Sequence, residues 1–221
     1  MLGSKARSSD LSARDVALGA LCCRAVLAPR SQRWRLEEVG LRSIRKMSEE
    51  WDRVYVTPLG EPNRDEVAAF WARYLHESGV DPSLSAPPAW CFGDTVELAD
   101  ELIELVVGGP KRATAGTVAE YEAEGEPLPV PGDLSIATDG SMRPRAVLET
   151  TEVRVGPLSS VDEQFAWDEG EGDRTRDWWL DAHTWAFTRA FARLGLQFRP
   201  HNPVVFERFV VRYQEDSVDE G

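Results

Sequence analysis

Cysteine is scarce in this sequence, and its placement excludes the usual structural uses of the residue. The 221-residue chain has three cysteines, Cys22, Cys23 and Cys91, two of which are adjacent. An odd count with one adjacent pair does not make a disulfide framework, and adjacent cysteines lack the spacing of zinc ligands. A reducing, cytoplasmic compartment therefore fits the composition best.

Long apolar runs are also missing. A helix that spans a bilayer needs about 20 mostly apolar residues, whereas the longest apolar patch near the N-terminus covers only residues 16–23, between Asp15 and Arg24. The hydrophobic residues, 42% of the chain with 8 Trp among them, are nonetheless enough for a core. We therefore expect a soluble protein with no membrane contact.

Positive charge is in deficit, and most of it lies at one end of the chain. The formal net charge is −13. Residues 1–46 hold ten Lys or Arg against four Asp or Glu, a net +6, which leaves −19 for residues 47–221. An acidic body repels a long phosphate backbone. The charge therefore favours a small nucleoside over an RNA polymer as the ligand.

The basic segment 1–46 ends at Met47, where the composition becomes acidic. We expect it to be a disordered tail or the result of a start site upstream of the true initiator, Met47. An RNA-binding arm is an alternative. A targeting peptide is another, although Asp10 and Asp15 are unusual in a transit peptide.

A first helix is predicted over residues 63–79, in a helical N-terminal extension that covers residues 47–89. Asn63 can cap it, with Glu66 at the capping-box spacing, and Gly79 ends it. Phe70, Trp71 and their neighbours at helical spacing make one apolar face. Residues 81–89 are rich in Pro and Ser and predict a linker or loop.

Two more helices are predicted on either side of Gly108-Gly109-Pro110. The first runs over about residues 95–107 with Asp94 as its cap, and the Gly-Gly-Pro sequence stops it. The second is short, over residues 115–124, and ends at Gly125.

The pattern then becomes alternating, with Val, Ile, Thr and Phe at strand spacing. The predicted strands are residues 134–138, 145–155 and 204–212. A long helix over about 174–194, capped by Asp173 and closed by Gly195, lies between the second and third strands. Helices that interrupt a run of strands without regular alternation indicate an α+β fold with a small barrel. The acidic tail 215–221 is expected to be frayed.

The segment from Gly108 to Ala115 contains a Lys and a Thr three residues apart, Lys111 and Thr114. A desolvated Lys can act as a base, and a Thr hydroxyl needs such a partner to become a nucleophile. Amides at a helix N-terminus could stabilise a developing anion. The alternative is that Thr114 only caps the helix and that Lys111 is a solvated charge.

A set of short motifs follows in order along the second half of the chain. They are Trp90–Asp94, Leu98–Leu102, the G-x-K-x-A-T element Gly109–Thr114, Tyr121-Glu122, Glu124–Glu126, Leu128-Pro129, Pro131–Asp133, Glu149–Val153, Glu169–Asp173, Trp179 with His183, Pro203–Val205 and Glu207–Phe209. In order and spacing this set resembles the ASCH domain family over Trp90–Tyr213. The resemblance implies an ASCH domain at residues 90–214, folded as a PUA-like β-barrel with a cleft beside the G-x-K-x-A-T element.

Members of this family are linked to RNA binding, to ribonuclease activity and to amide hydrolysis of N4-acetylcytidine. The hydrolase branch uses a Lys, a Thr three residues later and a Glu on a following strand. On this chain these positions fall on Lys111, Thr114 and Glu149. The resemblance then implies that Lys111, paired with Glu149, accepts the Thr114 proton while Thr114 attacks an acyl carbon.

Six further residues are candidates for substrate binding near this element. Trp90, Trp178 and Trp179 could stack a base, and His183 follows Trp179 by one helical turn. Arg112 and Tyr121 lie in the matching motifs. For the Trp and His side chains, packing in the core is the alternative.

The acidic sequence Glu169-Gly170-Glu171-Gly172-Asp173 supports a separate hypothesis. In an extended strand alternate residues share a face, so Glu169, Glu171 and Asp173 could converge on Mg²⁺ or Mn²⁺, as a ribonuclease needs. We favour a glycine turn in which Asp173 caps the following helix. No metal or other cofactor is then expected.

The leading functional hypothesis is a hydrolase that acts on a nucleoside or RNA from the Lys111, Thr114 and Glu149 cleft. The alternatives are a non-catalytic module that binds single-stranded RNA and a metal-dependent ribonuclease. No protein partner follows from the sequence.

Overall fold

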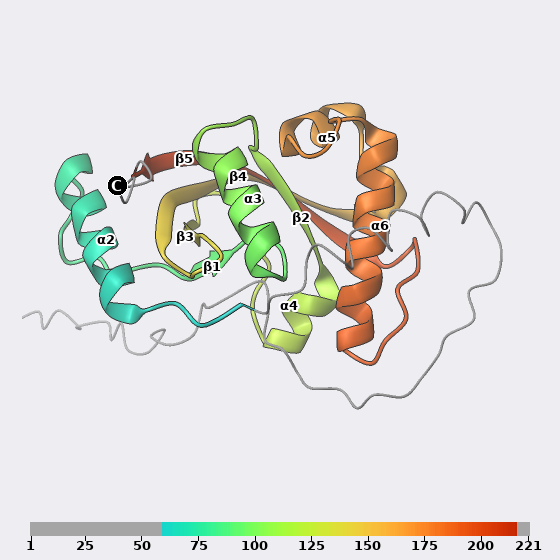
Figure 1. The fold of residues 1–221 in the computed structure, drawn as a ribbon, viewed down its shortest axis with the longest axis horizontal. Helices are drawn as coiled ribbons and strands as arrows, with labels where there is room; N and C mark the ends of the chain where they lie inside the picture. Colours follow the sequence, from blue (N-terminus) through green and yellow to red (C-terminus); the bar gives the residue numbers. More distant parts are fainter. Residues whose placement is uncertain (1–58, 216–221) are drawn as a thin grey trace, which may run out of the picture.

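The computed structural model describes residues 59–215 (Figure 1). The predictions for residues 1–46, for the first part of the extension and for the tail beyond Glu215 lie outside this range. Within it, no helix is long and apolar enough to cross a membrane.

A five-stranded mixed sheet is the centre of the described fold. Its strands are β1 (Ala89–Cys91), β2 (Ala113–Thr117), β3 (Leu134–Thr138), β4 (Pro144–Pro157) and β5 (Pro203–Gln214). They lie in the order β1-β3-β4-β5-β2, and only β1 and β3 pair in parallel. The α+β class is thus confirmed, but no ladder between β1 and β2 closes the sheet into a barrel within residues 59–215.

Helices cover the sheet at both ends and across one face (Figure 1). They are α2 (Arg64–Ser78), α3 (Val96–Val107), α4 (Val118–Glu124), α5 (Glu163–Glu169) and α6 (Arg176–Arg193), with a 3-10 turn at Leu158–Ser160. Helix α2 packs Phe70, Trp71 and Tyr74 against Ile136 of β3 and Val147 of β4. The described part of the N-terminal extension is therefore docked on the sheet.

The predicted helix caps are partly wrong. Asn63 caps α2 and Gly79 ends it in the left-handed conformation, as predicted. Helix α3 is capped by Thr95 instead of Asp94, whose carboxylate binds Arg189 and Arg193 of α6. A nearby pair of guanidinium groups offers that carboxylate a stronger partner than helix amides do.

The cap of α6 lies two residues later than predicted. Thr175 caps the helix, and its hydroxyl accepts a hydrogen bond from the amide of Trp178. Asp173 accepts hydrogen bonds from the backbone and the hydroxyl of Thr175, so it supports the cap without forming it.

The structure also contains elements that the sequence pattern did not predict, which are β1, β2, α5 and the 3-10 turn. The third predicted helix begins at Val118 instead of Ala115, because residues 113–117 pair with β5 as strand β2. Thr114 therefore lies in a strand. Its predicted alternative role as a helix cap is wrong, and Thr117 takes that position.

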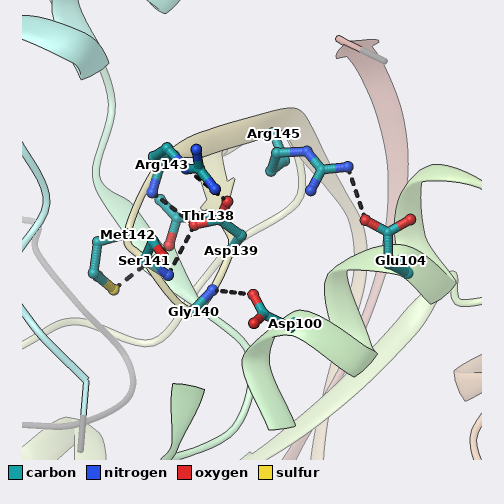
Figure 2. A network of polar contacts seen from close by, with 9 residues as sticks. All are labelled: Asp100, Glu104, Thr138, Asp139, Gly140, Ser141, Met142, Arg143 and Arg145. Carbon is teal, nitrogen blue, oxygen red and sulfur yellow. Dashed lines mark hydrogen bonds and ion pairs between the residues drawn. The ribbon is translucent and has the colours of Figure 1, made fainter. Parts of the chain in front are cut away.

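A polar network joins α3 to the turn between β3 and β4 (Figure 2). Asp139 is almost fully buried and accepts hydrogen bonds from the amides of Ser141 and Arg143. Gly140 donates its amide to Asp100 of α3 at 2.8 Å, and a Cβ atom on Gly140 would lie 2.3 Å from the carbonyl oxygen of Val96. This close approach fixes α3 over the sheet.

Candidate functional site

A cavity of about 270 Å³ lies between the sheet and helices α3, α4 and α6. Its walls are mostly apolar, and they contain both aromatic rings and carboxylates. The aromatic lining residues are Trp90, Phe92, Tyr121, Trp178, Trp185 and Phe187. The polar ones include Lys111, Thr114, Glu120, Glu124, Asp133, Glu171, His183 and Glu207. Flat apolar walls with a few polar groups are typical of small-ligand sites.

Lys111 is buried at this cavity with a carboxylate partner. Only 1% of its surface is exposed, and its ammonium forms an ion pair with Glu171. The ammonium also lies 5.2 Å from the centre of the Phe92 ring. Since α3 ends at Val107 and β2 begins at Ala113, Lys111 sits on the short connection between them. The alternative of a solvated Lys111 is wrong.

Thr114 lies on strand β2 and lines the cavity. It lies directly opposite Glu207 of β5 in the antiparallel register, and both residues line the cavity. Within residues 59–215 the Thr114 hydroxyl makes no hydrogen bond to another protein group. The hydroxyl is thus available to a ligand.

The predicted pairing of Lys111 with Glu149 does not occur. Glu149 binds Arg212 of β5 at 2.6 Å and is absent from the cavity lining. The hydrogen bond from Arg212 holds the pKa of Glu149 below its ordinary value. The next residue, Thr150, is buried and lines the cavity, because successive strand residues point to opposite faces.

The three carboxylates of the acidic segment do not converge either. Glu169 ends α5, Glu171 turns toward Lys111, and Asp173 binds Thr175. Among the described residues no group of three His, Cys, Asp or Glu is arranged to hold a metal ion. The segment is a glycine turn, as favoured from the sequence, and its middle carboxylate reaches the cavity.

Glu169 anchors a buried network behind the cavity wall. It is fully buried, and its Oε2 accepts hydrogen bonds from Trp179 at 2.6 Å and from His183 Nε2 at 3.3 Å. His183 Nδ1 donates to the carbonyl of Trp179, and the two rings stack 3.8 Å apart. Both imidazole nitrogens are therefore engaged, and His183 meets the cavity with its ring.

The two groups of this pair shift each other's pKa in opposite directions. Burial alone would raise the pKa of Glu169, but His183 and Lys111 bring it below its ordinary value. Burial alone would lower the pKa of His183, but the Glu169 carboxylate raises it above its ordinary value. Each group of the pair therefore favours the charged form of the other.

The glycines of this turn allow it to approach Lys111 and Trp178. A Cβ on Gly170 would lie 2.8 Å from the Pro110 ring and 3.0 Å from the Lys111 amide nitrogen. A Cβ on Gly172, which has φ +53°, would lie 2.1 Å from the Trp178 ring. The turn can present Glu171 to Lys111 only because these side chains are missing.

Gly172→Ala is therefore expected to displace Trp178 and to destabilise the protein by about 2–4 kcal/mol, from the clash together with the strained φ. Gly125→Ala is the matched control, because Gly125 has φ +73° and open space around its Cβ position. It should cost only about 1–2 kcal/mol of backbone strain. The free energies of unfolding in urea measure both, and equal losses would contradict the clash.

The predicted substrate-binding residues divide into two groups. Trp90, Tyr121 and His183 line the cavity. Arg112 does not, since its guanidinium binds the carbonyls of Val106 and of Lys111 at the end of α3. Trp179 is buried behind His183 and packs in the core, which was the alternative to its stacking a base.

Several cavity residues were not predicted from the sequence. Trp185 belongs to α6, and Glu124 ends α4, whereas Trp178 of α6 is a predicted stacking candidate that also lines the cavity. Burial, together with repulsion from Glu120 and Glu126, raises the pKa of Glu124 to about 7. From the sequence, Glu207 was identified only as part of the motif Glu207–Phe209. That Glu207 lies opposite Thr114 follows only from the register of β2 and β5.

Fold and cavity together define an α+β domain with a small-ligand cavity beside a mixed sheet. The chain belongs to the ASCH family, since the ASCH domain model matches residues 88–213. No curated protein matches the chain.

The chain also resembles solved structures. Protein EF3133 from Enterococcus faecalis V583, a DUF984 family protein, is 36% identical, with a TM-score of 0.61, over 66% of this chain and 88% of its own. An ASCH domain from Lactobacillus crispatus JV V101 is 31% identical, with a TM-score of 0.62, over 68% and 96% of the two chains.

Proposed function

We propose that the protein hydrolyses the exocyclic amide of a modified nucleoside of the N4-acetylcytidine type. The observation that supports this most is the buried Lys111–Glu171 ion pair on the same cavity as the unbonded Thr114 hydroxyl. A nucleophile beside a held amine and a carboxylate is the arrangement that acyl transfer requires. Glu171 here takes the role that the family resemblance gave to Glu149.

In the proposed reaction, the Lys111 ammonium passes a proton to Glu171 and the resulting amine accepts the Thr114 proton. The Thr114 oxygen attacks the acyl carbon and forms a C–O bond. The C–N bond then breaks, and the leaving nitrogen takes up a proton from an acid in the cavity. Water attacks the Thr114 ester: its hydroxyl joins the acyl carbon and its proton restores that acid. The proton held by Lys111 returns to the Thr114 oxygen as acetic acid leaves, and Glu171 returns the first proton to Lys111.

The shape and charge of the cavity support a nucleoside in preference to a nucleotide. Aromatic walls such as Trp90 and Tyr121 can contact a flat base. The lining holds more carboxylates, Glu101, Glu120 and Asp133 among them, than cations, and like charges disfavour a phosphate. The two cations of the lining, Lys111 and Arg193, are already paired with Glu171 and Asp94.

The test is release of acetate and cytidine from N4-acetylcytidine by the purified chain and by single variants. Thr114→Ala and Glu171→Gln should each lower kcat/KM by about 10² or more. Glu149→Gln, by contrast, should retain activity because Glu149 is bound to Arg212 outside the cavity. Loss in Glu149→Gln with retention in Glu171→Gln would return the role to Glu149.

Addition of EDTA should not change the rate, because the proposed reaction uses protein groups alone. The alternatives make different predictions. Binding of single-stranded RNA that weakens steeply with salt, without turnover, would favour the binding module. Turnover of RNA that EDTA abolishes would favour the metal-dependent ribonuclease.

A further inference from the structure

We propose that Glu207 is the acid that protonates the leaving amine, a role that rests on the proposed amide hydrolysis. Breaking a C–N bond at neutral pH requires a proton on the nitrogen, because an amide anion is a very poor leaving group. The group that accepts the nucleophile's proton can also deliver it to the leaving amine, as in the Ser-His-Asp triad. The assignment of this role to Glu207 therefore rests on the position of Glu207 and on its hydrogen bonds.

The register of the sheet places Glu207 beside the nucleophile. Thr114 and Glu207 are directly opposite in the β2–β5 ladder, so their Cβ atoms are about 4.5–5.5 Å apart and their side chains share a face. Both residues line the cavity, as do Lys111 and Glu171. An acyl group on Thr114 would lie within reach of the Glu207 carboxyl.

The hydrogen bonds of Glu207 suit a proton donor. The Thr150 hydroxyl donates to Oε1 at 2.5 Å, which fixes the carboxyl group. Within residues 59–215 no group binds Oε2, so a proton on that oxygen can pass to a ligand. No cation is paired with this carboxyl among the described ion pairs.

The surroundings of Glu207 favour its protonated form. Burial raises the pKa of this carboxyl above its ordinary value, and the nearby Asp133 carboxylate adds to the rise. The hydrogen bond from Thr150 acts in the opposite sense without reversing the shift. A carboxyl with a raised pKa is a common general acid.

The proton balance closes over the full reaction. Glu207 gives its proton to the departing nitrogen as the C–N bond breaks and becomes a carboxylate. In the second half, Glu207 accepts a proton from the water that attacks the Thr114 ester. Its acid form is restored when acetic acid leaves.

Two substrates with different leaving groups separate this role from others. Amide hydrolysis of N4-acetylcytidine requires a proton on the leaving group, whereas p-nitrophenyl acetate releases a stable phenolate without one. Glu207→Gln should lower kcat/KM for the amide by about 10²–10³ and leave kcat/KM for the ester, which reports acylation without the later hydrolysis of the Thr114 ester, within about threefold. Glu152→Gln is the control, because Glu152 is exposed and lies outside the cavity.

Equal losses for amide and ester would show that Glu207 is structural or binds substrate, and unchanged amide turnover would show that it is not needed. Either result overturns the inference. Failure of the proposed function is distinct. It would appear as no amide turnover by the wild-type chain, or as full activity in Thr114→Ala, and the role of Glu207 would then fall with it.

A second variant tests the inference if Glu207→Gln folds poorly. Thr150→Val removes the hydrogen bond that lowers the pKa of Glu207, so this pKa should rise further. An acid is active while protonated, so amide turnover is lost as pH rises through its pKa. The alkaline limb of kcat/KM should move to higher pH in Thr150→Val. An unmoved limb would contradict the assignment.

Discussion

Lys111→Met is expected to lower kcat/KM for N4-acetylcytidine by about 10³ or more, the largest catalytic effect in the molecule. Methionine keeps the length of the buried stem under Phe92 but removes the amine that the Thr114 hydroxyl needs. Because Lys111 is 1% exposed, no amine on the protein surface can take its place. Acetate release under saturating and limiting substrate measures the loss.

The same variant leaves Glu171 without its cation, so loss of activity must be separated from loss of stability. The Glu171 side chain is 16% exposed, and we expect a cost of about 1–3 kcal/mol from the unpaired carboxylate. The double variant Lys111→Met with Glu171→Gln removes both charges. It should recover most of the stability and none of the activity. Recovery of turnover would contradict a role for the amine.

The helical parts of the fold could be predicted because their signals are local. Asn63, Gly79 and the apolar face of α2 lie within one helix, and the same holds for the body of α3 and of α6. Strand β1 has three residues and α5 has seven, too few for a period to be recognised. Strand β2 was missed because its residues are strand only through pairing with β5.

The candidate site was predictable only where it is contiguous in sequence. Lys111 and Thr114 belong to one motif, but the partner of Lys111 is 60 positions away and depends on how the glycine turn folds back. Glu149 was chosen from its place on a strand. A shift of one residue along a strand changes the face, and the structure places Thr150 at the cavity instead.

The position of Glu207 opposite Thr114 also depends on the register between two strands. No signal in the sequence fixes which residue of β2 faces which residue of β5, so the Thr114–Glu207 pair required the ladder itself. The acidic cavity is also a property of the folded chain. Glu120, Glu124 and Glu207 come from two elements far apart in sequence, and the net charge alone predicts only that acids are abundant.

Glu169→Gln is expected to cause the largest loss of stability, about 3–5 kcal/mol near pH 6, because the buried His183 must then either stay charged without a partner or give up its proton. The glutamine retains a hydrogen-bond acceptor for Trp179, but His183 loses the carboxylate that keeps it protonated. Glu163→Gln on the exposed first turn of α5 is the control. It should change the free energy of unfolding by less than about 0.5 kcal/mol.

The effect of Glu169→Gln should depend on pH with a defined sign. The folded pKa of Glu169 is lowered, so its contribution is present above the ordinary value of about 4.3 and is lost as pH falls through the lower folded pKa. The folded pKa of His183 is raised, so its contribution is present below about 6.5 and is lost as pH rises through the higher folded pKa. Both contributions are complete between these ordinary values.

Denaturant unfolding at about pH 5.5 and pH 9.5 should therefore show a smaller difference between wild type and Glu169→Gln at the alkaline pH, because only the wild type still has a charged pair to lose. A difference that does not shrink would mean that Glu169 stabilises the fold through its hydrogen bond to Trp179 and not through the charge on His183.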